Sequence, residues 1–113
     1  MKRYKLAETA SVDIKGVADY TADNFGPAMR TTYNDLFRLG VANIVADPLR
    51  RGVTVASHLG DGIHVYHLRH VQQPRVKSPR HMIVYRLSAS GFITILRVLH
   101  DRVDPHRHVD NDN

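Results

Sequence analysis

Two consecutive strand-like segments near the C-terminus constrain the fold most, because both are apolar on both faces. Residues 80–87 and 92–100 are rich in β-branched and aromatic side chains and flank a glycine-containing turn, a pattern that predicts a β-hairpin. Strict alternation divides the second strand into Ile93, Ile95, Arg97 and Leu99 on one face and Thr94, Leu96, Val98 and His100 on the other. A chain this short covers only one face of a sheet with its own helices. The second apolar face therefore requires a partner or some other cover.

The composition is that of a small, basic, globular domain. The chain has 113 residues, enough for one domain, and its 16 Lys and Arg residues exceed its 11 Asp and Glu residues to give a net charge of +5. A basic domain suits an acidic partner, either nucleic acid or an acidic protein, although such a charge also serves solubility alone. The absence of cysteine excludes disulfides, thiolate zinc sites and cysteine nucleophiles. No apolar run resembles a signal peptide or a membrane span, so we expect a cytosolic protein.

Two helices are expected in the first half of the chain. Residues 8–24 and 27–46 carry apolar side chains at helical spacing. Between them, Gly26 suits the position just after a helix, and Pro27 suits the first position of the next one. Pro48 ends the second helix, because the residue before a proline is disfavoured in helical geometry. So short a connection predicts an antiparallel helix hairpin.

The remaining segments predict a small sheet. Strands are expected over residues 4–7 and 63–71, with a loop over residues 49–62 and a long connection over residues 72–79. The order is β-α-α-β-β-β, an α+β fold in which a helix hairpin packs on a small, mostly antiparallel sheet. One domain spans the whole chain, with a frayed acidic end at residues 110–113.

Histidines are candidate metal ligands. His64, His67 and His70 are three residues apart, but on a strand this spacing places neighbouring histidines on opposite faces. No adjacent carboxylate completes a zinc ligand set. We therefore expect polar strand positions, and neither a metal site nor a cofactor.

A second cluster on the expected hairpin has acid–base character: His81, Tyr85, Arg86, Arg97 and His100. A basic sheet face of this kind is able in principle to bind and cleave RNA, with arginine stabilising the phosphorane and histidine or tyrosine moving protons. The residues offer no matched acid–base pair, however. The sequence favours a structural alternative in which Arg86 and Arg97 form ion pairs. Asp13 and Asp35 are the possible partners.

Three segments resemble the ParE-type toxins of the RelE/ParE superfamily. The first helix contains Ala10-x-x-Asp13-Ile14-x-x-Val17-x-x-Tyr20, similar to the family pattern A-x-x-D-L-x-x-I-x-x-Y. Residues 81–86, HMIVYR, resemble the strand H-V-I-F-Y-R. The ending Ile93-x-Ile95-x-Arg97-Val98-Leu99-His100, followed by Asp104 and Arg107-His108-Val109, resembles I-x-I-x-R-V-L-H…D…H-L. The order and spacing of the three segments extend over nearly the whole chain.

The resemblance implies a function. ParE-type toxins belong to bacterial type II toxin–antitoxin modules, arrest growth by binding and inhibiting DNA gyrase, and are neutralised by a ParD-type antitoxin. RelE-type relatives instead cleave mRNA on the ribosome, and this endoribonuclease activity is the alternative. The chain has Arg97 and His100 but no clear second catalytic partner, which favours an inhibitor over an enzyme.

Two sets of surface residues are expected from the resemblance and from the two-faced hairpin. Basic residues late in the chain are expected to contact the target: Arg97, His100, Arg102 and Arg107. Apolar residues of the second sheet face and the neighbouring helix are expected to contact the antitoxin: Tyr33, Phe37, Val84, Tyr85, Leu96 and Val98. An antitoxin tail that folds on binding would bury these side chains.

Overall fold

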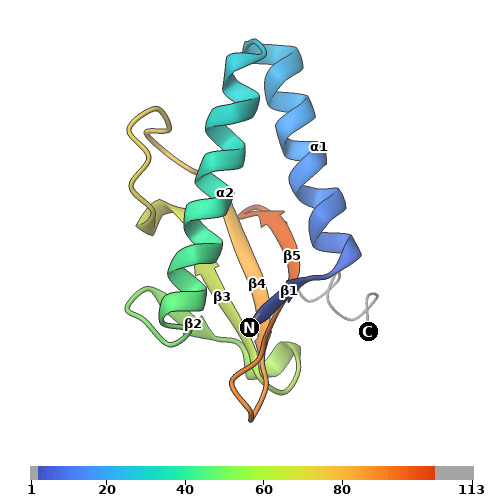
Figure 1. The fold of residues 1–113 in the computed structure, drawn as a ribbon, viewed down its shortest axis with the longest axis vertical. Helices are drawn as coiled ribbons and strands as arrows, with labels where there is room; N and C mark the ends of the chain where they lie inside the picture. The colour runs from blue at the N-terminus through green and yellow to red at the C-terminus, as the bar shows by residue number, and fades with distance from the viewer. Residues whose placement is uncertain (1–2, 104–113) are drawn as a thin grey trace.

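A layer of two helices lies on one face of a five-stranded sheet (Figure 1). The computed structural model describes residues 3–103. Its main elements are β1 (Tyr4–Leu6), α1 (Glu8–Phe25), α2 (Ala28–Ala46), β2 (Val53–Val55), β3 (Ile63–His67), β4 (His81–Leu87) and β5 (Ile93–His100). The strand order is β1-β5-β4-β3-β2, with β1 parallel to β5 and all other neighbours antiparallel. The predicted α+β architecture is confirmed, and β2 is a strand that the sequence pattern did not predict.

The helix hairpin forms where the sequence predicts it. Gly26 follows α1 with a φ of 102°, a conformation that favours glycine, and its N–H donates to the carbonyl of Ala22. α2 begins directly after Pro27 and ends before Asp47, which has an extended backbone. The tight link makes α1 and α2 antiparallel neighbours over the sheet (Figure 1).

The helices and the sheet enclose the larger core. Leu36 and Ile44 of α2 are fully buried against Tyr66, Ile83 and Ile95, which come from three central strands. Burying each side chain of this size contributes about 1.5–3 kcal/mol. This packing fixes α2 over the middle of the sheet.

The opposite face of the sheet is covered by the chain itself. Ala56 and Leu59, from the segment expected to be an open loop, pack with Met82, Val84 and Leu99. This segment contains β2 and a short 3-10 turn, which pack beside β3. The second apolar face thus has a cover that does not depend on a partner.

A β-bulge at Leu96 changes which face of the sheet the later side chains of β5 occupy. The register with β4 shifts by one residue between Val84 and Tyr85, which leaves Leu96 outside the pairing. One extra residue reverses the alternation of side chains. As a result, Val98 packs in the helix-side core and Leu99 packs on the opposite face. The predicted assignment of faces beyond Leu96 is therefore wrong.

Candidate binding surfaces

The first helix holds the bulge of β5 through polar contacts. Asp13 accepts two hydrogen bonds from the guanidinium of Arg97, at 2.8 and 3.0 Å, and a third from the N–H of Val98 at 2.9 Å. One turn earlier, Thr9 Oγ1 donates to the carbonyl of Leu96 at 2.8 Å. The side chains of Arg97 and Asp13 are only 16% and 14% exposed. We call this group the bulge clamp.

The bulge clamp holds the side chain of Arg97 against α1, where it is largely shielded from solvent. The predicted helix-facing ion pair between Arg97 and Asp13 is confirmed. The other arginine of that prediction, Arg86, donates from Nε to the carbonyl of Asp61. Because the guanidinium of Arg97 faces α1, this residue is poorly placed to contact a target at the surface.

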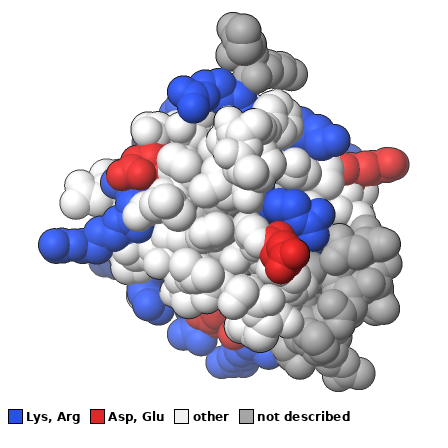
Figure 2. All heavy atoms as spheres, turned by 90° about the horizontal axis from the view of Figure 1, so that it is seen from below, with Lys and Arg blue, Asp and Glu red and all other residues white. Residues whose placement is uncertain are grey.

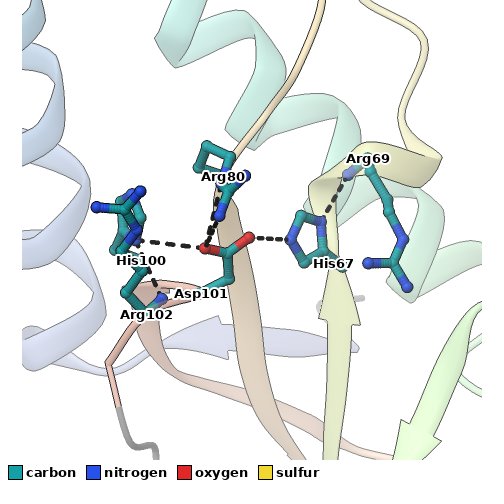
Figure 3. A network of polar contacts seen from close by, with 6 residues as sticks. All are labelled: His67, Arg69, Arg80, His100, Asp101 and Arg102. Atoms are coloured by element: carbon teal, nitrogen blue, oxygen red, sulfur yellow. Dashed lines mark hydrogen bonds and ion pairs between the residues drawn. The ribbon is translucent and has the colours of Figure 1, made fainter.

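A polar network forms where β3 and β5 end and β4 begins (Figure 3). At its centre, one carboxylate oxygen of Asp101 accepts from His67 Nε2 at 3.0 Å and the other accepts from Arg80 at 3.1 Å. The hydrogen bond from His67, followed by the one from Arg80, lowers the pKa of Asp101 below its ordinary value. Among residues 3–103, the network contains one carboxylate and three arginines. We call these arginines, together with His100, the basic end: Arg69, Arg80, Arg102 and His100.

Both histidines of the network use Nδ1 to hold the backbone. His67 Nδ1 accepts from the N–H of Arg69 at 3.0 Å, and His100 Nδ1 accepts from the N–H of Arg102 at 3.1 Å. The Nδ1 of His100 also lies 3.4 Å from a carboxylate oxygen of Asp101. An imidazole nitrogen that accepts a hydrogen bond carries no proton, so the contact with Arg69 places a proton of His67 on Nε2. His67 donates that proton to Asp101. The Nε2 of His100 has no hydrogen-bond partner among residues 3–103.

His81 is a largely buried histidine beside the basic end. Its ring packs edge-on against Phe37 and His100, with centroid separations of 6.2 and 5.3 Å. Burial, reinforced by the neighbouring His100, lowers the pKa of His81 from 6.5 to about 4. The ring is therefore uncharged at neutral pH.

We expect the free energy of unfolding to fall as the pH drops from 6.5 to about 4. A histidine with a depressed folded pKa favours the folded state while it is neutral. Its contribution is complete above the unfolded pKa and is lost as the pH falls towards the folded pKa. The loss should be about 1–2 kcal/mol, because partial solvation of the ring reduces the effect of the shift. Urea unfolding across this pH range measures it. His81→Gln should flatten the profile, and an unchanged profile would assign the effect to other groups.

An apolar groove lies along α2 beside β1. Its volume is about 550 Å³, and it is lined by Tyr4, Leu6, Ile14, Asn34, Phe37, Arg38, Val41, Ala42, Val45 and Ala46. Leu6 is 42% exposed, which is high for a large apolar side chain at the wall of a groove. We call this feature the α2 groove. Its shape and lining suit the apolar face of an amphipathic helix.

The residues expected to contact an antitoxin fall into two groups. Four lie in the core of the chain itself, each at most 3% exposed: Phe37, Val84, Tyr85 and Val98. The hydroxyl of Tyr85 donates to the carbonyl of Pro48, and burial raises its pKa. A partner would touch most of this group only if the core opened, although Phe37 also reaches the wall of the α2 groove. Tyr33 and Leu96 are half-buried and remain accessible.

A second hollow, of about 820 Å³, lies between the helix hairpin and the C-terminal part of β5. The helices contribute apolar and aromatic walls, and the sheet side contributes Ser78, Arg80, His81 and His100. We call it the hairpin cavity. It adjoins the basic end, because Arg80 and His100 belong to both.

The structure brings together only part of the expected target-contacting set. His100 and Arg102 lie side by side in the basic end, whereas Arg97 belongs to the bulge clamp. Arg107 lies outside the described residues. The expected set did not include Arg80, which directly precedes β4 and reaches across to Asp101. The basic residues of the connection from Arg69 to Arg80 suit phosphate binding, but they did not indicate this contact.

A family model described as ParE toxin of type II toxin-antitoxin system, parDE, matches residues 4–105. The chain belongs to this family. No curated protein sequence matches it. In this ParE toxin, Asp13 of the first motif and Arg97 of the last form the ion pair of the bulge clamp. Membership also places the chain in a type II module, whose toxin has an antitoxin partner.

The outer surface of the ParE toxin carries scattered positive charge. Seen from the lower end of the molecule, lysines and arginines surround an area of uncharged residues, with fewer acidic side chains between them (Figure 2). Within residues 3–103, neither α1 nor α2 is long and apolar enough to cross a membrane. A surface of this charge favours encounter with an acidic partner.

Proposed function

We propose that this ParE toxin inhibits DNA gyrase by binding, without catalysing a reaction, and that a ParD-type antitoxin neutralises it. The family match over residues 4–105 carries the proposal. The polar network supports it, because both nitrogens of His67 and the Nδ1 of His100 hold the protein's own backbone and Asp101. Groups engaged in this way are poorly suited to moving protons on a substrate.

The target contact is assigned to the basic end. Arg69 and Arg102 are exposed, and neither forms an ion pair with another of the described residues. Exposed arginines offer planar, multidentate donors to an acidic surface. His100 and Arg102 remain from the expected set, Arg69 and Arg80 join them, and Arg97 is left out because Asp13 engages it.

The antitoxin contact is assigned to the α2 groove. It is apolar, and Leu6 and Val45 leave part of their surface to solvent. Arg38 lines the groove and is exposed, although it pairs with Asp35. An acidic amphipathic helix of a ParD-type antitoxin would match both the apolar lining and the basic charge of the toxin.

Gyrase supercoiling with purified toxin tests both assignments through reciprocal variants. We expect Arg69→Glu/Arg102→Glu to weaken inhibition by at least about tenfold while antitoxin binding is retained, since charge at a contact steers and holds the complex. Leu6→Asp should keep inhibition and lose rescue by the antitoxin. The matched control Arg51→Glu/Lys77→Glu makes the same charge change on other exposed loops and should behave as the wild type.

Three results would contradict these assignments. Equal loss of inhibition in the control would show a general charge effect. If the antitoxin neutralised Leu6→Asp at the same concentration as the wild type, the antitoxin would not bind in the α2 groove. Undisturbed supercoiling, combined with mRNA cleavage on ribosomes, would replace the gyrase proposal with the endoribonuclease alternative.

A further inference from the structure

The hairpin cavity is unusual for its exposed aromatic walls. Tyr20 and Phe25 of α1 line it and are 66% and 72% exposed, and Tyr33 of α2 faces the same hollow. Large aromatic side chains bury much of their surface when they only support a core. Gly16 of α1 also lines the cavity, with no neighbouring atom within 4 Å of the position of a Cβ. The helix therefore leaves open space here that no side chain of its own fills.

The end of the cavity nearest the sheet carries hydrogen-bond donors. Arg80 is 55% exposed there, and the Nε2 of His100 has no hydrogen-bond partner among residues 3–103. Asp13 also lines the cavity, but its carboxylate is engaged by Arg97 and the N–H of Val98. The cavity thus presents donors to an anion without an uncompensated carboxylate beside them.

Positive charge continues from the cavity across the end of the sheet. Arg80 stands at the cavity, and Arg102 and Arg69 lie on either side of Asp101 in the same network (Figure 3). Among residues 3–103, three arginines and one carboxylate belong to this strip, which gives these residues a net positive charge. A planar aromatic pocket followed by a strip of arginines matches a chain that alternates flat bases with phosphates.

We propose that the hairpin cavity and the basic end together bind single-stranded nucleic acid. A base stacks on the rings of Tyr20 and Phe25, and the phosphates that follow lie along Arg80 and Arg102. Stacking of this kind tolerates any base, so the site has little sequence preference. A duplex is a poor ligand, because its bases are already stacked and paired. An acidic peptide satisfies the arginines but offers no series of planar rings to the cavity.

The inference concerns a second ligand of the basic end and does not depend on gyrase. The binding assay contains no gyrase, so its failure leaves the gyrase proposal standing. Failure of gyrase inhibition likewise leaves nucleic acid binding untouched. A variant of Tyr20 also distinguishes nucleic acid binding from gyrase inhibition, because Tyr20 lines the hairpin cavity and is not part of the basic end.

Fluorescence anisotropy of a short, fluorescein-labelled oligothymidine, titrated with the full-length toxin at low salt, tests the proposal. We expect Tyr20→Ala to weaken binding about tenfold or more, through loss of one stacked base. Arg80→Gln and Arg102→Gln should each reduce the slope of log affinity against log salt by about 0.7. Arg51→Gln, which removes an exposed arginine outside the site, should change affinity by less than about twofold. Circular dichroism confirms that each variant is folded.

Several outcomes would overturn the proposal. They are an absence of binding by the wild type at low salt, equal losses in Arg51→Gln and Arg102→Gln, and full affinity in Tyr20→Ala. Equal competition by a duplex of the same sequence would rule out entry of a base into the cavity. Stronger competition by an acidic peptide than by the unlabelled oligonucleotide would assign the cavity to a protein partner.

Discussion

Replacing Asp13 with leucine is expected to lower the free energy of unfolding by about 3–5 kcal/mol, because it removes a carboxylate that pairs with a shielded arginine. Asp13 neutralises Arg97 through two hydrogen bonds and also satisfies the N–H of Val98. Leucine supplies neither charge nor acceptor. The variant therefore removes both the carboxylate that pairs with this guanidinium and the acceptor of the Val98 N–H.

Urea unfolding monitored by circular dichroism measures the effect, and Asp19→Ala is the matched control. Asp19 pairs with Lys15 and Arg30 on the surface, so its loss should cost no more than about 1 kcal/mol. The double variant Asp13→Leu/Arg97→Leu should recover part of the stability, because it also removes the shielded charge that Asp13 neutralises. A loss in Asp13→Leu no larger than that in Asp19→Ala would show that the bulge clamp does not stabilise the fold.

Replacing Gly62 with alanine is expected to lower the free energy of unfolding by about 2–4 kcal/mol, through backbone strain and a clash. Gly62 has a φ of +75°, and a Cβ there would lie 2.6 Å from the carbonyl oxygen of Leu87. That backbone has little freedom to move, because the N–H of Leu87 donates to the carbonyl of Gly62 at 2.9 Å. The same carbonyl accepts from His64 Nδ1 at 2.8 Å.

The same substitution at Gly16 is the control, and it should raise the free energy of unfolding. Gly16 lies in an exposed part of α1 where a Cβ meets nothing within 4 Å. Alanine should therefore stabilise the chain by about 0.5–1 kcal/mol, since it favours the helix and restricts the unfolded state. Differential scanning calorimetry on the two variants compares them directly. If both variants changed the unfolding temperature in the same direction, the positive φ and the close contact at Gly62 would not explain its effect on stability.

The bulge clamp connects the fold to the candidate site. By reversing the alternation of β5 after Leu96, the bulge determines which face each later residue joins. His100 follows on the same strand and leads directly to Asp101, which carries the polar network. Destabilising the bulge clamp should therefore disturb the basic end as well as the core.

The sequence by itself determined the elements that depend on near neighbours in the chain. Helical spacing and the Gly26-Pro27 pair established the helix hairpin, and two β-branched runs around a turn established β4 and β5. The Asp13–Arg97 pair was also foreseeable, because a shielded arginine needs a carboxylate and Asp13 lies on the inner side of its helix. Such patterns are local, or follow from the need to neutralise a charge.

The tertiary structure alone decided the features that depend on residues far apart in the chain. The bulge at Leu96 is a shift of one residue that alternation cannot show, and it moved Val98 and Leu99 to faces opposite to those predicted. Ala56 and Leu59 became the cover of the second sheet face only because the segment after α2 packs back on it. The basic end likewise formed when the ends of three strands met, which joined His67 to Asp101 across 34 positions. Spacing along one strand carries no information about which strand ends will be neighbours in the sheet.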